Sequence, residues 1–293
     1  MLSAKIGYFR ATAHPEAADW RARVIANGGS VSASTFAAVE AFCRAVDTAG
    51  IRSRFYRLNL FCGTGLSAAL VPLYRGQSLG GTQFGNATDT NANFVAGDYV
   101  EVGTTGGLGT GASNATKSLG TGLVAFNAGM LHTDTHMSFY SRNGNTSTGA
   151  VMAVGHAVTS TQHWQWFLNT TSGPLSVFYR SGGPNSSGFD GVDAPARTGH
   201  LIAQRSGSSA ALYRQGVNAN VGTNTTNTVA WTTGLPAALR VFARNWFSPN
   251  QTTDQFISTT LQSYSLGLSF TNAQALAYHN ALQAFQTALG RQL

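Results

Sequence analysis

The apolar positions near the start of the chain follow a helical period. After Pro15, which suits the first turn of a helix, apolar side chains return every three or four positions until Gly28. A second series lies between Ser32 or Ser34, either of which can cap a helix, and Gly50, which can supply a left-handed stop. The two stripes are Ala17, Trp20 and Val24, then Phe36, Val39, Cys43 and Val46. This pattern predicts a helical hairpin packed on a larger body.

From Phe55 onward the period changes to that of short strands bounded by Gly, Asn, Ser and Pro. These segments lie at 57–61, 138–141, 164–168, 175–179, 200–204, 211–214 and 238–243. Short strands with few helices between them favour an antiparallel β-sandwich over a parallel α/β sheet. The Gly- and Thr-rich run at 104–121 should be mostly loop. We expect the following side chains to be largely buried: Leu58, Leu60, Phe139, Phe167, Phe178, Leu201, Leu212 and Val241.

The end of the chain returns to a helical period. Thr271 and Gln274 have the spacing of a capping box, and Gly290 can end the helix. Its apolar stripe is Tyr278, Leu282, Phe285 and Leu289. The sequence thus divides into an arm and helical hairpin at 1–54, a mainly β sandwich at 55–270, and a helix at 271–293 that packs on the sandwich or on a neighbouring subunit.

The amino-acid composition limits the kinds of partner that this protein is expected to bind. Charged residues make up 10% of the chain, against roughly 25% in typical globular proteins. The net charge is +7, and all basic residues except Lys5 and Lys117 are arginines. Because the arginines are scattered, nucleic-acid binding is not expected. The sequence has neither a signal-peptide pattern nor a membrane-length apolar stretch, so we expect synthesis in the cytosol and no membrane partner. Cys43 and Cys62 are expected to be buried thiols.

The most specific local pattern is His132-Thr-Asp134-Thr-His136. On a strand, these alternate positions would place two imidazoles and a carboxylate on one face, as a transition-metal site requires. The alternative interpretation is the polar face of a half-solvated strand, with Asp134 hydrogen-bonded to an adjacent imidazole. Met137 and Phe139 would then point into the core. We favour this second interpretation and assign no metal; the residues stay candidates for glycan or subunit contacts.

Trp164 and Trp166 share a strand face in a second candidate binding surface. Two aromatics beside amides and Asn-rich loops are typical of sugar binding, but we favour burial in a core or a subunit interface, because large aromatics dominate interior burial. A glycoside hydrolase would instead need two acids flanking the scissile bond. Among 11 acids, only Asp98 with Glu101 and Asp190 with Asp193 are close outside the helices, and neither spacing puts both on one strand face. We therefore expect no enzyme activity.

The first fourteen residues form a candidate docking arm. The arm combines Ile6, Tyr8 and Phe9 with Lys5 and Arg10. Its apolar area is too small to fold alone, so these aromatics need another surface to bury them. We expect the arm to bind a neighbouring subunit.

Several stretches resemble a known family. The segments SRFYRLNLFCG at 53–63, AALVPL at 68–73 and TDTNANFVAGDY at 88–99 resemble the opening of laminin-G/concanavalin A-like virion structural proteins of tailed bacteriophages and prophages. Residues 197–205 and 211–216 are similar to the middle of that family's sandwich. Residues 264–271 and 284–291 are similar to its end. The Gly-rich stretch at 103–122 departs from the pattern.

The resemblance implies a concanavalin/laminin-G-like jelly roll on a phage particle, as a capsid decoration or a tail or fibre component. Such a virion protein acts by packing against other virion proteins and copies of itself. No catalytic residue carries over and no cofactor is implied, with calcium disfavoured by the scarcity of acids in the loops. The alternatives are a module that binds a host-surface glycan and, third, a polysaccharide hydrolase.

Overall fold

The computed structural model describes residues 12–111, 116–143, 149–156, 162–169, 176–182, 192–193, 198–223, 237–248 and 250–293. For 149–150, 153–156, 162–169, 176–182, 192–193, 219–223, 247–248 and 250–251 it describes the backbone only.

The three long helices lie where their sequence patterns predict them, and the one-turn helix at Leu66–Ala69 was not predicted. The described α-helices are α1 (Pro15–Ala26), α2 (Ala33–Thr48), the short α3 (Leu66–Ala69) and α4 (Asn272–Ala288). The 3-10 turns are η1 (Arg52–Arg54) and η2 (Ala96–Asp98). Ser32 caps α2, and Thr271 forms the predicted capping box with Gln274 at the start of α4. Gly50 follows α2 with a φ of 65°, a left-handed conformation that glycine adopts without steric cost. Within the described residues, no helix is long and apolar enough to cross a membrane.

The strands form two sheets. The first, which we call the helix-covered sheet, has the order β13 (Val217–Thr223), β12 (Ser209–Arg214), β11 (Gly199–Ser206), β6 (Asp134–Ser141), β17 (Thr260–Gly267), β4 (Gly107–Gly109) and β3 (Tyr99–Val100). Strand β1 (Phe55–Asn59) pairs with β17 as well, with Asn59 opposite Tyr264. Strand β17 therefore lies between β6 and β1, which joins the end of the sequence to its beginning.

The second sheet has the order β10 (Val192–Asp193), β9 (Ser176–Gly182), β8 (Gln162–Asn169), β7 (Gly149–His156), β14 (Arg240–Val241), β5 (Ser118–Gly120) and β2 (Thr90–Ala92). Strand β15 (Arg244–Ser248) pairs with β7 in parallel and with β16 (Asn250–Asp254) antiparallel. The other strand pairs between the described strands are antiparallel. The fold is thus the predicted concanavalin/laminin-G-like antiparallel β-sandwich.

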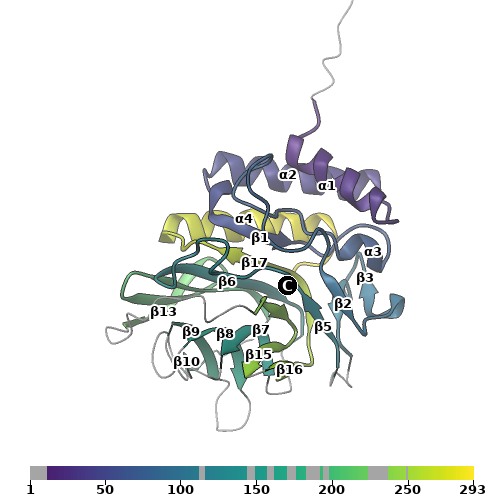
Figure 1. The fold of residues 1–293 in the computed structure, drawn as a ribbon. Helices are drawn as coiled ribbons and strands as arrows, with labels where there is room; N and C mark the ends of the chain where they lie inside the picture. Colours follow the sequence, from purple (N-terminus) through teal and green to yellow (C-terminus); the bar gives the residue numbers. More distant parts are fainter. Residues whose placement is uncertain are drawn as a thin grey trace, which may run out of the picture.

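Helices α1, α2 and α4 form a third layer over the outer face of the helix-covered sheet (Figure 1). One core lies between the two sheets and includes Met137, Phe139 and Leu201. The other lies between the sheet and the helices, where Tyr278, Leu282, Phe285 and Leu289 are buried as predicted. Where the helices cover the sheet, the structure therefore has three layers, the two sheets and the helices.

The helix layer overturns one expectation. Strand β6 was predicted to be half solvated, but positions 135–141 are all buried because its second face lies under the helices. Of the side chains predicted to be buried, Leu58, Leu60, Phe139, Leu201, Leu212 and Val241 are buried. The side chains of Phe167 and Phe178 lie outside the description.

Candidate functional site

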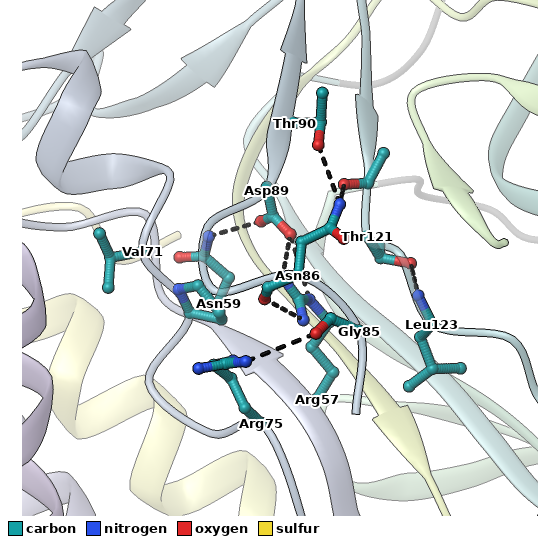
Figure 2. A network of polar contacts seen from close by, with 12 residues as sticks. Arg57, Asn59, Val71, Arg75, Gly85, Asn86, Asp89, Thr90, Thr121 and Leu123 are labelled. Carbon is teal, nitrogen blue, oxygen red and sulfur yellow. Dashed lines mark hydrogen bonds and ion pairs between the residues drawn. The ribbon is translucent and has the colours of Figure 1, made fainter. Parts of the chain in front are cut away.

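An ion pair closed to solvent lies beside strand β17. The Arg57 guanidinium, on β1, donates to Asp89 through Nη2 at 2.7 Å and through Nε at 3.1 Å. Its Nη1 and Nη2 also donate to the Asn86 carbonyl oxygen (Figure 2). Charges that are removed from water are stable only when hydrogen bonds satisfy them, and this pair is satisfied on both sides.

Further polar groups complete this network. The Tyr264 hydroxyl donates to Asp89 at 2.7 Å, and Asn59 Nδ2 donates to the other carboxylate oxygen at 2.8 Å (Figure 2 shows Asn59 and Asp89). Burial raises the pKa of Tyr264 well above its usual range, and the Asp89 carboxylate acts in the same direction. Asn59 also reaches the Ala69 carbonyl.

Four of the stretches that resemble virion proteins contribute residues to the hydrogen-bond network around Arg57 and Asp89. Arg57 and Asn59 come from 53–63, Ala69 from 68–73, Asp89 from 88–99 and Tyr264 from 264–271. Because Arg57, Asn59 and Tyr264 are at most 1% exposed, the network cannot meet a ligand. The stretches that carry the resemblance therefore build the framework of the fold.

His136, predicted to face solvent, is also inaccessible. Its Nδ1 donates to the Leu268 carbonyl at 2.7 Å, so its Nε2 accepts from the Ser265 hydroxyl at 2.8 Å. Burial lowers the pKa of His136 to about 3. Ser265 continues through Ser138 to the Tyr278 hydroxyl on α4. This chain of hydrogen bonds connects α4 to the sheet. Both nitrogens of the neutral His136 imidazole already have hydrogen-bond partners.

Asp134 turns away from the imidazoles. Its Oδ1 accepts from the backbone N–H of Ser269, at 2.9 Å, and from the Ser269 hydroxyl, which corrects the predicted hydrogen bond to a histidine. His132 is buried, and burial together with Arg205 lowers its pKa. Within the described residues, no three His, Cys, Asp or Glu side chains are grouped as a metal site would need. The structure therefore separates the His132, Asp134 and His136 constellation.

Asp134 nevertheless lines an open polar pocket of about 440 Å³. Its walls are Arg54 with residues 133–134, 206–207 and 269–271, and we call it the Arg54–Asp134 pocket. It lies where η1, the start of β6, the β11–β12 turn and the link from β17 to α4 meet. The sequence pattern identified Asp134 but missed Arg54. Arg54 directly precedes β1, all of whose residues are buried. A basic residue at the start of a buried strand was the sequence feature that could have identified it.

The other predicted contact residues cannot be placed. The side chains of Trp164 and Trp166, on β8, lie outside the described residues. The same is true of the whole arm with Lys5, Ile6, Tyr8, Phe9 and Arg10. Both candidates stay predictions.

The acids of the described chain are engaged in structure. Each carboxylate accepts from at least one donor: Glu16 from Arg52, Asp19 from Arg23, Glu40 from the His14 N–H, Asp47 from His14, Asp89 from Arg57, Asp98 from Lys117, Glu101 from Thr35, Asp134 from Ser269 and Asp254 from Arg244. Asp98 and Glu101, the described pair of the hydrolase alternative, point to different partners. The side chains of Asp190 and Asp193 are not among those described.

Comparisons with known proteins give similarity of structure alone. No family model and no curated protein matches the chain. A CBM40 domain of the Ruminococcus gnavus IT-sialidase, bound to alpha2,3 sialyllactose, matches 49% of this chain and 80% of its own at 11% identity and a TM-score of 0.34. A heptameric SAP-like pentraxin from Limulus polyphemus matches 50% of this chain and 69% of its own at 14% identity and a TM-score of 0.34. A mutant Trypanosoma rangeli sialidase displaying trans-sialidase activity matches 84% of this chain and 39% of its own, at 10% identity and a TM-score of 0.46. Function must therefore be inferred from the chain's own residues.

Proposed function

We propose that this chain is a non-catalytic structural protein at the surface of a tailed-phage particle, which acts by binding neighbouring virion proteins and copies of itself. The observation that supports the non-catalytic part is that Asp98 and Glu101, the described acid pair of the hydrolase alternative, are held by different partners, Lys117 and Thr35. General acid–base chemistry needs a carboxyl group that can approach a substrate and exchange protons with it. Here Asp89 is closed to solvent, and Asp98 is held by Lys117 at 2.6 Å.

The edge of the helix-covered sheet supports a packing role. Strand β3 lies at that edge, and the exposed valines around it are Val95 at 61%, Val100 at 42% and Val102 at 53%. Apolar side chains at a sheet edge favour association with another chain. The phage setting itself rests on the resemblance of residues 53–63, 68–73 and 88–99 to virion proteins.

Two measurements test this proposal. Antibodies raised against the chain should label purified phage particles in electron micrographs, and the purified chain should release no reducing sugar from bacterial capsule or lipopolysaccharide. Absence of the chain from gradient-purified particles contradicts the virion role. Turnover that is lost on replacing Asp98 or Glu101 contradicts the non-catalytic role.

A second candidate is a module that binds host-surface glycans, and the Arg54–Asp134 pocket favours it. The pocket is open, polar and large enough for a sugar unit, and it offers both donors and acceptors. Binding of the isolated chain to an array of bacterial glycans would support this function. An array without any bound glycan excludes it and leaves the packing role.

A further inference from the structure

We propose that the Arg54–Asp134 pocket binds a saccharide that carries a carboxylate, with Arg54 on the carboxylate and Asp134 on a sugar hydroxyl. This inference rests on the glycan-binding candidate and names the ligand class and the residues that select it.

The Arg54 guanidinium is a free donor on a fixed base. The backbone of Arg54 is held by two hydrogen bonds: its N–H donates to Ile51 at 3.0 Å, and its carbonyl accepts from Leu268 at 2.8 Å. Its guanidinium has no hydrogen-bond partner within the described residues. Arg52, in the same turn, instead donates to Glu16 at 2.6 Å and to the Gly76 carbonyl at 2.7 Å. Arg54 is therefore available to an external anion, and its planar fork suits a carboxylate.

Asp134 lines the same pocket. Ser269 occupies Oδ1, and Oδ2 has no partner within the described residues, so this oxygen can accept from a ligand hydroxyl. Although Arg54 and Asp134 line one pocket, they form no ion pair with each other in the described structure. A cation and an anion that share a pocket without pairing can hold the two ends of one ligand.

The charges of the pocket favour a monoanionic sugar. A neutral saccharide would leave the guanidinium without an anionic partner, and a phosphate dianion would be repelled by Asp134. A sugar with one carboxylate satisfies Arg54, and its hydroxyls satisfy Asp134 and the nearby hydroxyl of Thr133 or Ser206. The volume of about 440 Å³ falls in the range of small-ligand sites.

The walls of the pocket are preorganised. Gly207 N–H donates to the Thr133 carbonyl at 2.7 Å, which fixes the β11–β12 turn against the start of β6. Phe270 N–H donates to Gln204 at 2.8 Å, which fixes the link to α4. Binding would then require ordering of the Arg54 side chain and little else, which limits its entropic cost.

Calorimetric titration with methyl β-glucuronide and methyl β-glucoside tests the inference, because these probes differ only in the C6 carboxylate. We expect the glucuronide to bind at least about tenfold more tightly, a difference of about 1.4 kcal/mol. Arg54→Gln should remove this preference, Arg54→Lys should keep part of it, and Asp134→Asn should weaken both probes. The control Arg44→Gln removes one positive charge from α2, outside the pocket, and should change nothing. Amide NMR shifts at Gly207 and Ser269 should follow saturation, and thermal melts check that each variant is folded.

The possible outcomes distinguish failure of this inference from failure of the glycan-binding function on which it rests. Equal binding of the two probes, or a glucuronide preference that survives Arg54→Gln in a folded protein, overturns the inference. If array glycans still bind in either case, the glycan-binding function survives with its site elsewhere. Equal affinity for acetate and glucuronide overturns it too, because the pocket would then be a general anion site. If neither probe nor any array glycan binds, the inference and the glycan-binding function fail together.

Discussion

Arg57 and Asp89 form an ion pair, 2.7 Å from Nη2 to Oδ1, in which neither side chain is exposed. Asp89→Ala would leave the guanidinium buried without its counter-charge, and we expect a loss of about 3 to 5 kcal/mol of unfolding free energy. The matched control is Asp254→Ala, which breaks the ion pair of Arg244 with a carboxylate side chain that is 39% exposed. That change should cost less than about 1 kcal/mol. Urea unfolding measures both, and similar losses would contradict the prediction.

The rings of Phe285 on α4 and Phe42 on α2 meet edge to face at a centroid distance of 6.1 Å. Because Phe285 is buried between the helices and the sheet, Phe285→Ala should cost about 3 to 5 kcal/mol. Leu276 lies on the same helix and is 44% exposed, so Leu276→Ala should stay within about 0.5 kcal/mol of the parent. An unchanged unfolding midpoint for Phe285→Ala would show that α4 does not stabilise the sandwich.

Buried histidines should make the fold sensitive to acid. Burial lowers the pKa of His136 to about 3 and that of His200 well below its usual range. The unfolded chain takes up these protons near pH 6.5, so stability is full above this pH and falls as the pH drops toward the folded pKa. Each histidine contributes a slope of up to about 1.4 kcal/mol per pH unit.

His200→Phe tests the acid sensitivity. Within the described residues, neither ring nitrogen of His200 has a hydrogen-bond partner, and its ring packs edge-on against Tyr278 at 4.7 Å between centroids. A phenyl ring keeps this packing and removes the titration, so unfolding free energy should fall less steeply between pH 6.5 and pH 4.5 than in the parent. The same slope in both proteins would count against the assignment.

The two thiols should be unreactive in the folded protein. Cys43 and Cys62 are free and buried, and burial raises the pKa of Cys43 to about 12. Since the thiolate is the reactive form, an aromatic disulfide reagent should modify neither at pH 8 and both after denaturation in guanidinium. Rapid modification of the native protein would show that the helix layer opens easily.

The arm remains a prediction from sequence. Deleting residues 2–13 should leave folding near normal and reduce incorporation into particles, because the core residues that the structure describes all come later in the chain. Thermal melts and the protein content of purified particles measure the two effects. Full incorporation of the shortened chain would make the arm dispensable, and failure to fold would place it in the core.

The sequence predicted the elements better than their environment. Helical periods located α1, α2 and α4, and the stripe through Tyr278 and Phe285 showed that α4 needed a surface to cover. What the pattern lacked was the identity of that surface. His136 and Ser138 alternate with Met137 and Phe139, as in a strand with one solvent-exposed face. The helices nevertheless cover that face, and the two polar side chains are linked by hydrogen bonds through Ser265, while Ser138 is also hydrogen-bonded to Tyr278.

The buried network was also beyond sequence pattern, because its members are distant along the chain. Arg57 and Asp89 are separated by 32 positions, and Arg57 and Tyr264 by 207. Periodicity reports neighbours on one element and says nothing about such pairs. A signal did exist: Arg57 lies among Phe55, Tyr56 and Leu58, and a charge in an apolar strand requires a buried partner.

The position of β17 between β1 and β6 has a consequence for synthesis on the ribosome. Neither β1 nor β6 can gain this neighbour until residues 260–267 have been translated, so the helix-covered sheet stays open while most of the chain already exists. Such late closure makes folding slow and leaves strand edges available to other nascent chains. Overexpression should therefore yield aggregates whose amount rises with the rate of translation, because the open strand edges then meet more nascent chains.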